Sequence, residues 1–470
     1  MPTCNRKAVL TRLRYPRRPT STSVPVRSDP RMVSTLPKRT ESFQNTEFRT
    51  IRYLGNKRKL TDNICAAIED ASSVGNHVID LFAGSCSVSY QVKRTHQVLS
   101  NDNQLYSFYL AKALIENERD RISSRRAVNE LRSGYLDHVA QLSSPMENRL
   151  ALEEALLSAD TDDSKALQRY QVFCRRTPHV GRTGRAGDIS DLIRVAKARS
   201  QDRRRRNPWG LFTAYFSNAY FGLQQCIQID AIRRSIEEAE VGGRGWKKHL
   251  YLAALMYSLS ESVSAPGHFA QYLKPTSPDV YARLQRERKK SIWQAFLENL
   301  TLLSSFVIKT PYDHRATCKE WSVALRSQKR RLRPGGGVIY ADPPYTADHY
   351  SRFYHVLNTL IRYDYPASIG AGRYPEARSA SRFSMASTVT GEFESLARTS
   401  AAMGASLILS YSNRGLLDAR SILAISRRHF GRVTLGWTNH PHSRQGRHQG
   451  ETETEDQPRR EYLISCTRPL

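Results

Sequence analysis

Short apolar runs bounded by polar turns mark both ends of the chain, and they are too short for buried helices. Such runs, bounded by turn residues, are typical of buried strands in a parallel sheet. The pattern predicts strands over 77–82, 98–99, 305–308, 338–341 and 406–409. Two later runs, 433–437 and 462–466, are separated by a long charged stretch. They predict an antiparallel hairpin whose two strands are joined by a long exposed loop.

The middle of the chain has a helical pattern instead. Apolar residues lie three or four positions apart, as at Leu252, Leu255, Met256 and Leu259. The predicted fold is therefore α/β, a Rossmann-like doubly wound sheet interrupted by a mostly helical insertion. We expect a division into 1–45, a disordered basic arm; 46–118, the first part of the sheet domain; 119–304, the insertion; and 305–470, the second part.

The arm has few acids, only Asp29 and Glu41, and no apolar period, which predicts disorder. Its composition also fits an organellar transit peptide, an alternative that composition leaves open.

The whole chain of 470 residues is strongly basic, with a formal net charge of +28. Such a charge favours polyanionic partners, above all nucleic acid, because bound phosphates release counterions. No apolar run approaches the eighteen or so residues that would span a bilayer, so we expect no membrane segment. The seven cysteines lack a Cys-x-x-Cys pair and histidines at metal spacing, which predicts reduced thiols and no metal.

The stretch Asp342-Pro343-Pro344-Tyr345 directly follows the predicted strand 338–341, at a carboxyl end where α/β sheets bind ligands. Asp342 and the carbonyl after it can accept both hydrogens of an exocyclic amine, and the prolines fix the backbone. Tyr345 can stack on the base that carries the amine. Beyond this motif, the pattern predicts a helix over 350–363 and a polar loop over the substrate at 373–387.

An amine polarised in this way attacks a methyl donor directly, without a covalent enzyme intermediate. Methylation at a pyrimidine ring carbon instead needs a thiolate, typically in a Pro-Cys pair, which this chain lacks.

A second candidate site follows the first predicted strand. Asp80, Phe82, Ala83 and Gly84 lead into a turn of small residues, where a cofactor can approach the backbone, and a helix is expected to begin near Ser87. Asp102 follows the next strand, in the position of an acid that holds ribose hydroxyls; helix capping is the alternative. Gly-x-Gly-x-x-Gly is absent, which argues against a dinucleotide.

Three weaker signals complete the set of candidates. Tyr53, Gly55 and Lys57 combine an aromatic ring, a flexible glycine and a cation that would face a cofactor carboxylate. The run Arg203, Arg204, Arg205 and Arg206 is suited to phosphates or guanine edges, or is a solvated surface. His268, in a turn, is suited to structure or phosphate contact.

In the order of these motifs the chain resembles the Dam-like, or alpha, class of DNA adenine-N6 methyltransferases of restriction-modification systems. The resemblance covers roughly 46–118 and 305–466. It implies that S-adenosylmethionine is held by Tyr53, Gly55, Lys57, Asp80, Phe82, Ala83, Gly84 and Asp102, and that Asp342, Pro343, Pro344 and Tyr345 are catalytic. Where the family usually has a second loop glycine, this chain has Cys86, which puts the local backbone in doubt.

The resemblance further implies a flipped-out adenine in duplex DNA as substrate, a cognate restriction endonuclease as companion, and a bacterial or viral host cytoplasm as location. The motifs leave three alternatives open: a cytosine-N4 methyltransferase, an RNA amino-methyltransferase, and an inactive DNA-binding protein on the same scaffold.

Overall fold

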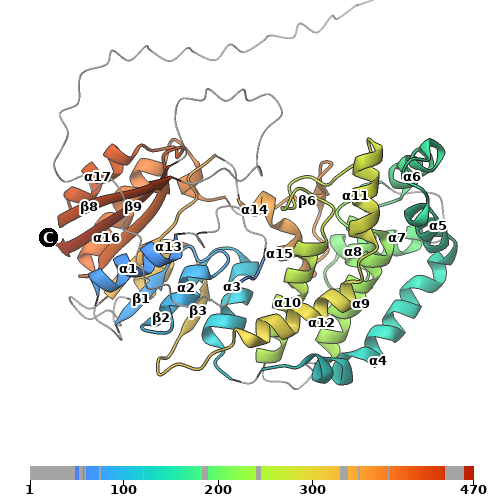
Figure 1. Cartoon of the computed structure of the whole chain (residues 1–470), viewed down its shortest axis with the longest axis horizontal. Coiled ribbons are helices and arrows are strands. Elements are labelled where there is room, and N and C mark those ends of the chain that lie inside the picture. The colour runs from blue at the N-terminus through green and yellow to red at the C-terminus, as the bar shows by residue number, and fades with distance from the viewer. Residues whose placement is uncertain are drawn as a thin grey trace, which may run out of the picture.

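The protein folds into a sheet lobe and a helical lobe that lie side by side (Figure 1). The computed structural model describes residues 48–51, 57, 60–72, 76–119, 121–182, 189–239, 245–328, 337–347, 350–378, 380–439 and 460–470.

The sheet lobe is built on seven strands within this described part, in the order β3-β2-β1-β4-β7-β9-β8. The strands are β1 His77–Asp80, β2 Gln97–Asp102, β3 Arg315–Cys318, β4 Gly337–Ala341, β7 Ser406–Ser412, β8 Phe430–Asn439 and β9 Arg460–Pro469. The five from β3 to β7 are parallel, and β9 lies antiparallel between β7 and β8. Chain order reverses between β1 and β4, which makes the gap at their carboxyl ends the switch point of the sheet.

Most of the predicted strands are confirmed, and β8 and β9 pair as the predicted terminal hairpin. The loop of this hairpin and the basic arm predicted over 1–45 lie outside the described residues. The strand predicted over 305–308 is wrong. Helix α12 (Ile292–Ser305) ends there, and Phe306 and Val307 are buried in coil against the sheet lobe. The strand is β3 instead, where only Ala316 is buried, so no apolar run signals it.

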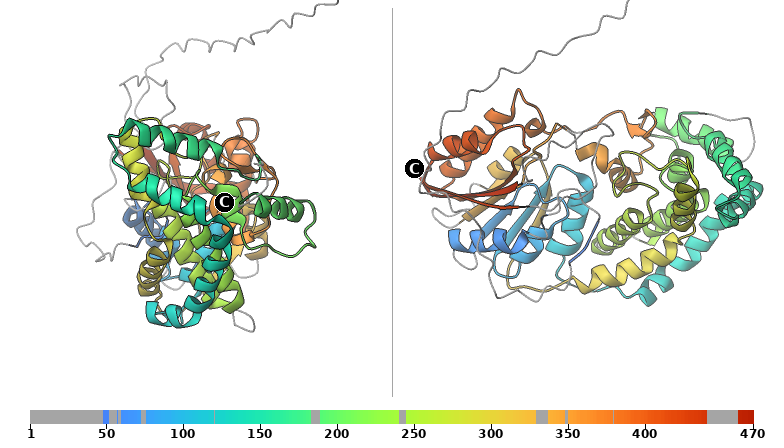
Figure 2. Two further views of the ribbon diagram at one scale, coloured as in Figure 1. Left: turned by 90° about the vertical axis from the view of Figure 1, so that its right-hand side faces the viewer. Right: turned by 45° about the horizontal axis from the view of Figure 1, so that its top comes forward.

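Helices cover both faces of the sheet, as a doubly wound fold requires (Figure 2). Alternate strand residues enter different cores: Val78 and Val338 face one side, Ile79 and Ile339 the other. The first face packs against α1 Thr61–Ala71, α2 Ser87–Val92 and α3 Leu105–Ala111. The second packs against α13 Trp321–Gln328, α16 Val389–Ala402 and α17 Ala419–Arg427.

The helical lobe lies between β2 and β3 in the chain, and its main core is continuous with the first face of the sheet. Its helices are α4 Ser124–Ser143, α5 Glu147–Ser158, α6 Ser164–Arg176, α7 Ile189–Gln201, α8 Leu211–Phe216, α9 Leu223–Ala239, α10 Trp246–Ser262, α11 Pro278–Arg288 and α12. The aromatic side chains of α8 are buried, as a core role requires. The division at 119 and 304 remains our proposal for the domain boundaries.

The buried side chain of Lys93 ties together the two crossings between the lobes. Its Nζ donates to the carbonyls of Leu114 (3.1 Å) and Ile115 (2.9 Å), where the chain leaves the sheet lobe. It also reaches the carbonyl of Ile308 (3.5 Å), where the chain returns. Burial lowers the pKa of Lys93 to about 8. The cation thus fixes the exit and the return of the insertion relative to each other.

The segment after β4 also connects the two lobes, in addition to the exit and the return of the insertion. The helix predicted over 350–363 is confirmed with a break: α14 Tyr350–Phe353 and α15 His355–Arg362 meet at Tyr354. The loop predicted over 373–387 is only partly right, because Arg373 is buried and donates to the carbonyls of Tyr215 and Ser217 in the insertion. The first residue of the predicted loop is therefore anchored in the helical lobe.

Candidate active site

The candidate site lies at the switch point, where the carboxyl ends of β1 and β4 are adjacent. Asp80 ends β1 opposite Tyr340 of β4, and Asp342 follows β4 by one residue. The Leu81 amide donates to the Tyr340 carbonyl (3.0 Å), so the pairing continues past the end of β1. The two predicted motifs, far apart in the chain, are thereby brought to one edge of the sheet.

Asp342 is held by an ion pair that joins three segments of the chain. Lys57 Nζ lies 3.2 Å from Asp342 Oδ1 and 3.1 Å from Glu461 Oε2, and both Lys57 and Glu461 are buried. The Asp342 side chain itself is 17% exposed, although its Oδ1, the oxygen that faces Lys57, is buried. Burial raises the pKa of Asp342 to about 6, although the charge of Lys57 opposes this shift. For Lys57, burial would lower the pKa, but Asp342 and Glu461 together raise it well above its ordinary value.

Tyr345, predicted to stack on a base, is only 5% exposed. Its ring lies edge-on to Tyr411 with centroids 6.0 Å apart, and Lys57 Nζ lies 5.4 Å from its centroid. Its carbonyl accepts from the Leu416 amide (2.9 Å), which anchors the backbone after the prolines. A base could stack on this ring only by displacing part of what now covers it.

The turn after β1 is tied to the end of β2 by backbone and carboxylate bonds. The Ala83 amide donates to the Asn101 carbonyl (2.9 Å), and the Gly84 amide donates to Asp102 Oδ2 (2.8 Å). The other Asp102 oxygen accepts from the Gln104 amide (2.8 Å). Burial raises the pKa of Asp102 to about 6, against these hydrogen bonds. Asp102 thus holds the turn in shape, and each of its oxygens retains a lone pair for a further donor.

The same turn has an unsatisfied acceptor that fits a polar ligand. Asp80 is buried; its Oδ2 accepts from Ser89 Oγ (2.6 Å), while its Oδ1 has no hydrogen-bond partner among the described residues. Burial raises the pKa of Asp80 to about 7, and the charges of Asp102 and Asp342 add to the effect. A buried acceptor without a donor is rare, so this turn can accept a hydrogen bond from a polar ligand.

Cys86 adopts the backbone conformation that a glycine would have. Its φ of 63° and ψ of 18° lie in the left-handed region, and its side chain is fully buried. The departure from the family pattern therefore leaves the turn in a glycine-like shape at a strain of about 1 kcal/mol. Burial also raises the pKa of the Cys86 thiol, which keeps it protonated and unsuited as a nucleophile.

The remaining predicted residues lie elsewhere or cannot be placed. Tyr53 and Gly55 fall outside the described residues. The four arginines from 203 to 206 are exposed after α7 in the helical lobe. His268 is 9% exposed, its Nδ1 accepts from the Ala270 amide (3.2 Å), and its ring centroid lies 5.0 Å from that of Phe353 in α14. His268 thus packs against α14, the first helix after the Asp342 motif.

The residue of this ion-pair cluster that sequence reasoning missed is Glu461, the second residue of β9. Because β9 runs antiparallel to β7, it begins at the edge where β4 and β7 end, and Glu461 pairs in register with Ser412. In the sequence it is one more charged residue, directly before the predicted strand 462–466, and only the topology of the hairpin reveals its place in the site.

Metal sites and membrane spans were considered only for the residues that the structure describes. No group of three His, Cys, Asp or Glu side chains there is arranged to hold a metal ion. None of the helices in that part of the chain has the length and apolar character needed to cross a membrane.

Comparison with known proteins gives a family and several relatives. The family model for D12 class N6 adenine-specific DNA methyltransferases matches residues 53–157 and 187–398. The chain is 24% identical over 386 residues to the type II methyltransferase M.FokI of Planomicrobium okeanokoites, covering 81% of this chain and 47% of that protein. It is 24% identical over 394 residues to M.NlaIII of Neisseria lactamica, and 22% identical over 394 residues to M.CviAII of Paramecium bursaria Chlorella virus 1.

These relatives differ in length. The chain spans about half of M.FokI and of the modification methylase LlaI of Lactococcus lactis, but 91% of M.NlaIII and of M.CviAII. The family match covers more than half of this chain and contains both strands that form the switch point. The chain therefore belongs to the D12 class of N6 adenine-specific DNA methyltransferases.

Proposed function

We propose that this protein transfers a methyl group from S-adenosylmethionine to the exocyclic N6 amine of an adenine flipped out of duplex DNA, at a specific site. The observation that carries the proposal is Asp342. It is a partly exposed carboxylate with a raised pKa, one residue beyond the central strand, beside an aromatic ring and opposite the cofactor turn.

In the proposed reaction, Asp342 and the carbonyl that follows it accept the two amine hydrogens of the target base. This withdraws the nitrogen lone pair from the ring and directs it outward. Bound S-adenosylmethionine supplies the electrophilic methyl group. As the bond between the amine nitrogen and the methyl carbon forms, the methyl–sulfur bond would break and release a neutral thioether. The amine, now cationic, would then lose a proton to Asp342 or to water. Because a stacked base cannot reach Asp342, the base must be flipped out, at a cost of a few kcal/mol that stacking on Tyr345 partly offsets.

The proposed cofactor site consists of the turn after β1 and the end of β2. We assign Asp80, Phe82, Ala83, Gly84 and Asp102 to it from the described residues. Tyr53 and Gly55 are assigned by resemblance alone. Lys57 pairs with Asp342 and Glu461 in this structure, and its ammonium has a third hydrogen that a cofactor carboxylate can accept.

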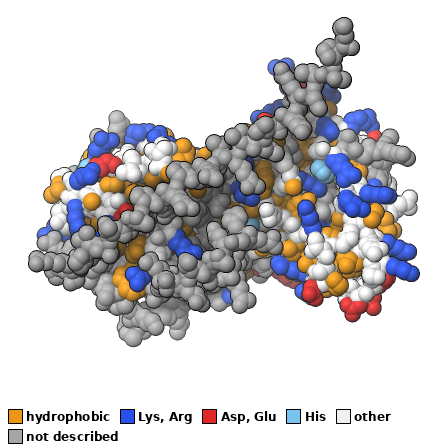
Figure 3. All heavy atoms as spheres, turned by 90° about the horizontal axis from the view of Figure 1, so that it is seen from above, with side chains coloured by type: hydrophobic (Ala, Val, Ile, Leu, Met, Phe, Trp, Pro, Cys, Tyr) orange, Lys and Arg blue, Asp and Glu red, His pale blue; other side chains and the backbone are white. Residues whose placement is uncertain are grey.

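DNA binding is assigned to the basic surface, with the helical lobe as the part that reads the target. Figure 3 shows Lys and Arg side chains spread over the visible face of this lobe. The exposed arginines from 203 to 206 suit phosphate contacts, whose loss weakens binding of all sequences alike. A cognate restriction endonuclease is the proposed companion, and the bacterial or viral host cytoplasm the proposed location.

The direct test incubates the protein with isotopically labelled S-adenosylmethionine and unmethylated duplex DNA, then identifies the labelled nucleoside by mass spectrometry. Label on N6-methyldeoxyadenosine is the expected result. Label on cytosine would give the N4 reaction, and label on RNA only would change the substrate. DNA binding without any transfer would instead indicate an inactive member of the family.

The rate of transfer is expected to fall below pH 6. Since Asp342 must be ionised to accept the amine and its pKa is raised to about 6, kcat/KM for DNA should drop about tenfold per pH unit below that value. Assays at saturating cofactor separate this titration from that of Asp80 and Asp102.

Protonation of Asp342 would not unfold the protein, so unfolding at this residue cannot account for the expected loss of transfer rate at low pH. A carboxyl whose folded pKa lies above its ordinary value of 3.8 destabilises the fold mainly above about pH 6, and this cost fades as the pH falls towards 4. A flat rate between pH 8 and pH 5, with DNA binding unchanged, would contradict the assigned role.

A further inference from the structure

Glu461 makes a contact that the proposed chemistry does not yet use. Its carboxylate is 6% exposed and lies 3.1 Å from Lys57 Nζ. The same ammonium lies 3.2 Å from Asp342 Oδ1 and 5.4 Å from the centroid of the Tyr345 ring. The backbone beside it is fixed, because Asn413 Oδ1 accepts from the Arg460 amide (3.0 Å) and the Asn413 amide donates to the Arg460 carbonyl (3.0 Å).

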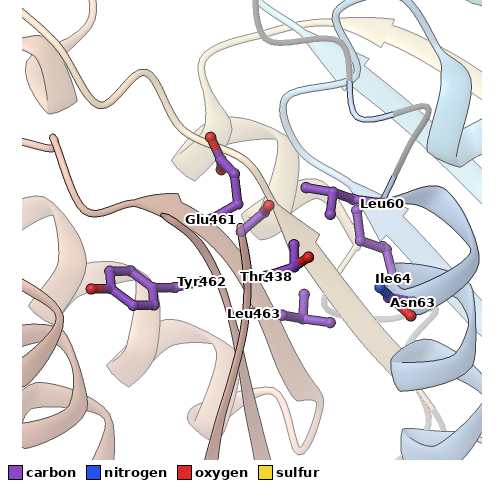
Figure 4. Close-up of a pocket in the computed structure, with 8 residues that line it drawn as sticks. Leu60, Asn63, Ile64, Thr438, Glu461, Tyr462 and Leu463 are labelled. Carbon is purple, nitrogen blue, oxygen red and sulfur yellow. The ribbon is translucent and has the colours of Figure 1, made fainter. Parts of the chain in front are cut away.

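The surroundings of Glu461 are partly apolar. It lines a small pocket between α1 and the terminal strands together with Leu60, Ile64 and Leu463 (Figure 4). Charges in such surroundings interact more strongly than in water, so each member of the ion pair affects the others.

Lys57 presents the proposed reaction with a conflict. Its ammonium occupies Asp342 Oδ1 and lies near the face of Tyr345, which are the two groups that the target base needs. If Asp342 were the only acidic partner of Lys57, the amine of the target base would have to compete with the full positive charge of Lys57 for the same oxygen. The pair would also be neutral overall, and would therefore stabilise the cationic amine that forms during transfer less than a cluster with a net negative charge.

We propose that Glu461 is a positioning residue of the transfer step, which retains the Lys57 ammonium so that the amine can take its place on Asp342. With two carboxylates and one ammonium, the cluster has a net charge of −1 facing the amine. Its negative charge stabilises the positive charge that develops on the amine nitrogen. The inference rests on the proposed function and names a residue that acts through Lys57, without contact with the substrate.

The test is Glu461→Gln, which keeps the shape of the side chain and removes its charge. We expect kcat to fall about ten- to a hundredfold, as when one preorganised electrostatic group is removed. DNA affinity should stay within about threefold, because phosphate contacts dominate it. The acid limb of the pH–rate profile should move to lower pH, since the charge of Glu461 raises the pKa of Asp342 and its removal lets that carboxyl ionise more easily.

Two further variants separate this role from a structural one. Glu461→Asp keeps the charge and should recover part of the rate. Glu394→Gln removes a carboxylate that pairs with Arg428 and His429 on another part of the sheet lobe, and it should behave as wild type.

The outcomes are distinct. A wild-type rate and pH profile in Glu461→Gln would overturn the inference, and so would a loss of activity matched by equal losses of cofactor binding and thermal stability. Absence of transfer by the wild-type protein on DNA would instead refute the proposed function itself.

Discussion

Asp342→Ala should lower the rate of methyl transfer by about a thousandfold or more, because the amine loses the acceptor that polarises it. Binding of DNA and of S-adenosylmethionine should change little. The fold should also persist, since Lys57 keeps its second partner, Glu461, and is not left as an unpaired buried charge. Single-turnover assays with labelled cofactor measure the rate, and titration with the same duplex measures DNA binding.

Two variants make this result interpretable. Asp342→Asn preserves the volume of the side chain but replaces one acceptor oxygen with a donor, so it should be nearly as inactive as the alanine variant. Asp313→Asn alters an exposed aspartate, 62% accessible, at the other end of the sheet before β3, and should leave the rate unchanged. Turnover of Asp342→Ala within tenfold of wild type would remove this carboxylate from the mechanism.

The central part of the site was predictable because its signals are local. Asp80 and Asp342 each follow a short apolar run, and parallel strands on either side of a switch point must end at the same edge. Two strands and their following residues therefore suffice to bring the motifs together. The helical insertion was equally visible, since amphipathic spacing repeats over many turns.

The parts that could not be predicted depend on contacts between distant segments. Lys57 and Glu461 are 404 positions apart, and no local pattern pairs them. Edge strand β3 has only one buried residue, while the apolar residues Phe306 and Val307 pack as coil, so composition pointed to the wrong segment. Arg373 was expected in a polar loop, yet its guanidinium satisfies carbonyls of the insertion from inside the core.

Asp230 of α9, in the helical lobe, also holds together segments that are distant in the sequence, and it does so through more hydrogen bonds. Its buried carboxylate accepts from the Phe212 and Thr213 amides (both 2.8 Å) at the start of α8, and from Thr213 Oγ1 (2.8 Å). The Tyr363 hydroxyl, just after α15, also donates to it. One side chain thus connects two helices of the insertion with the segment that follows the catalytic motif. Burial raises the pKa of Asp230 to about 7, even though these donors favour the ionised form.

Asp230→Ala is expected to destabilise the protein by about 3–5 kcal/mol, because it leaves several buried donors without an acceptor. Tyr363→Phe removes one donor from the same carboxylate and also the acceptor of the Leu211 amide (3.3 Å), and it should cost only about 1–2 kcal/mol. Urea unfolding followed by circular dichroism gives both values. Since the carboxylate joins the insertion to the catalytic segment, Asp230→Ala should also weaken DNA binding at temperatures where the sheet lobe remains folded and still binds cofactor. Equal stability of the two variants would mean that the bonds to α8 contribute nothing beyond the Tyr363 contact.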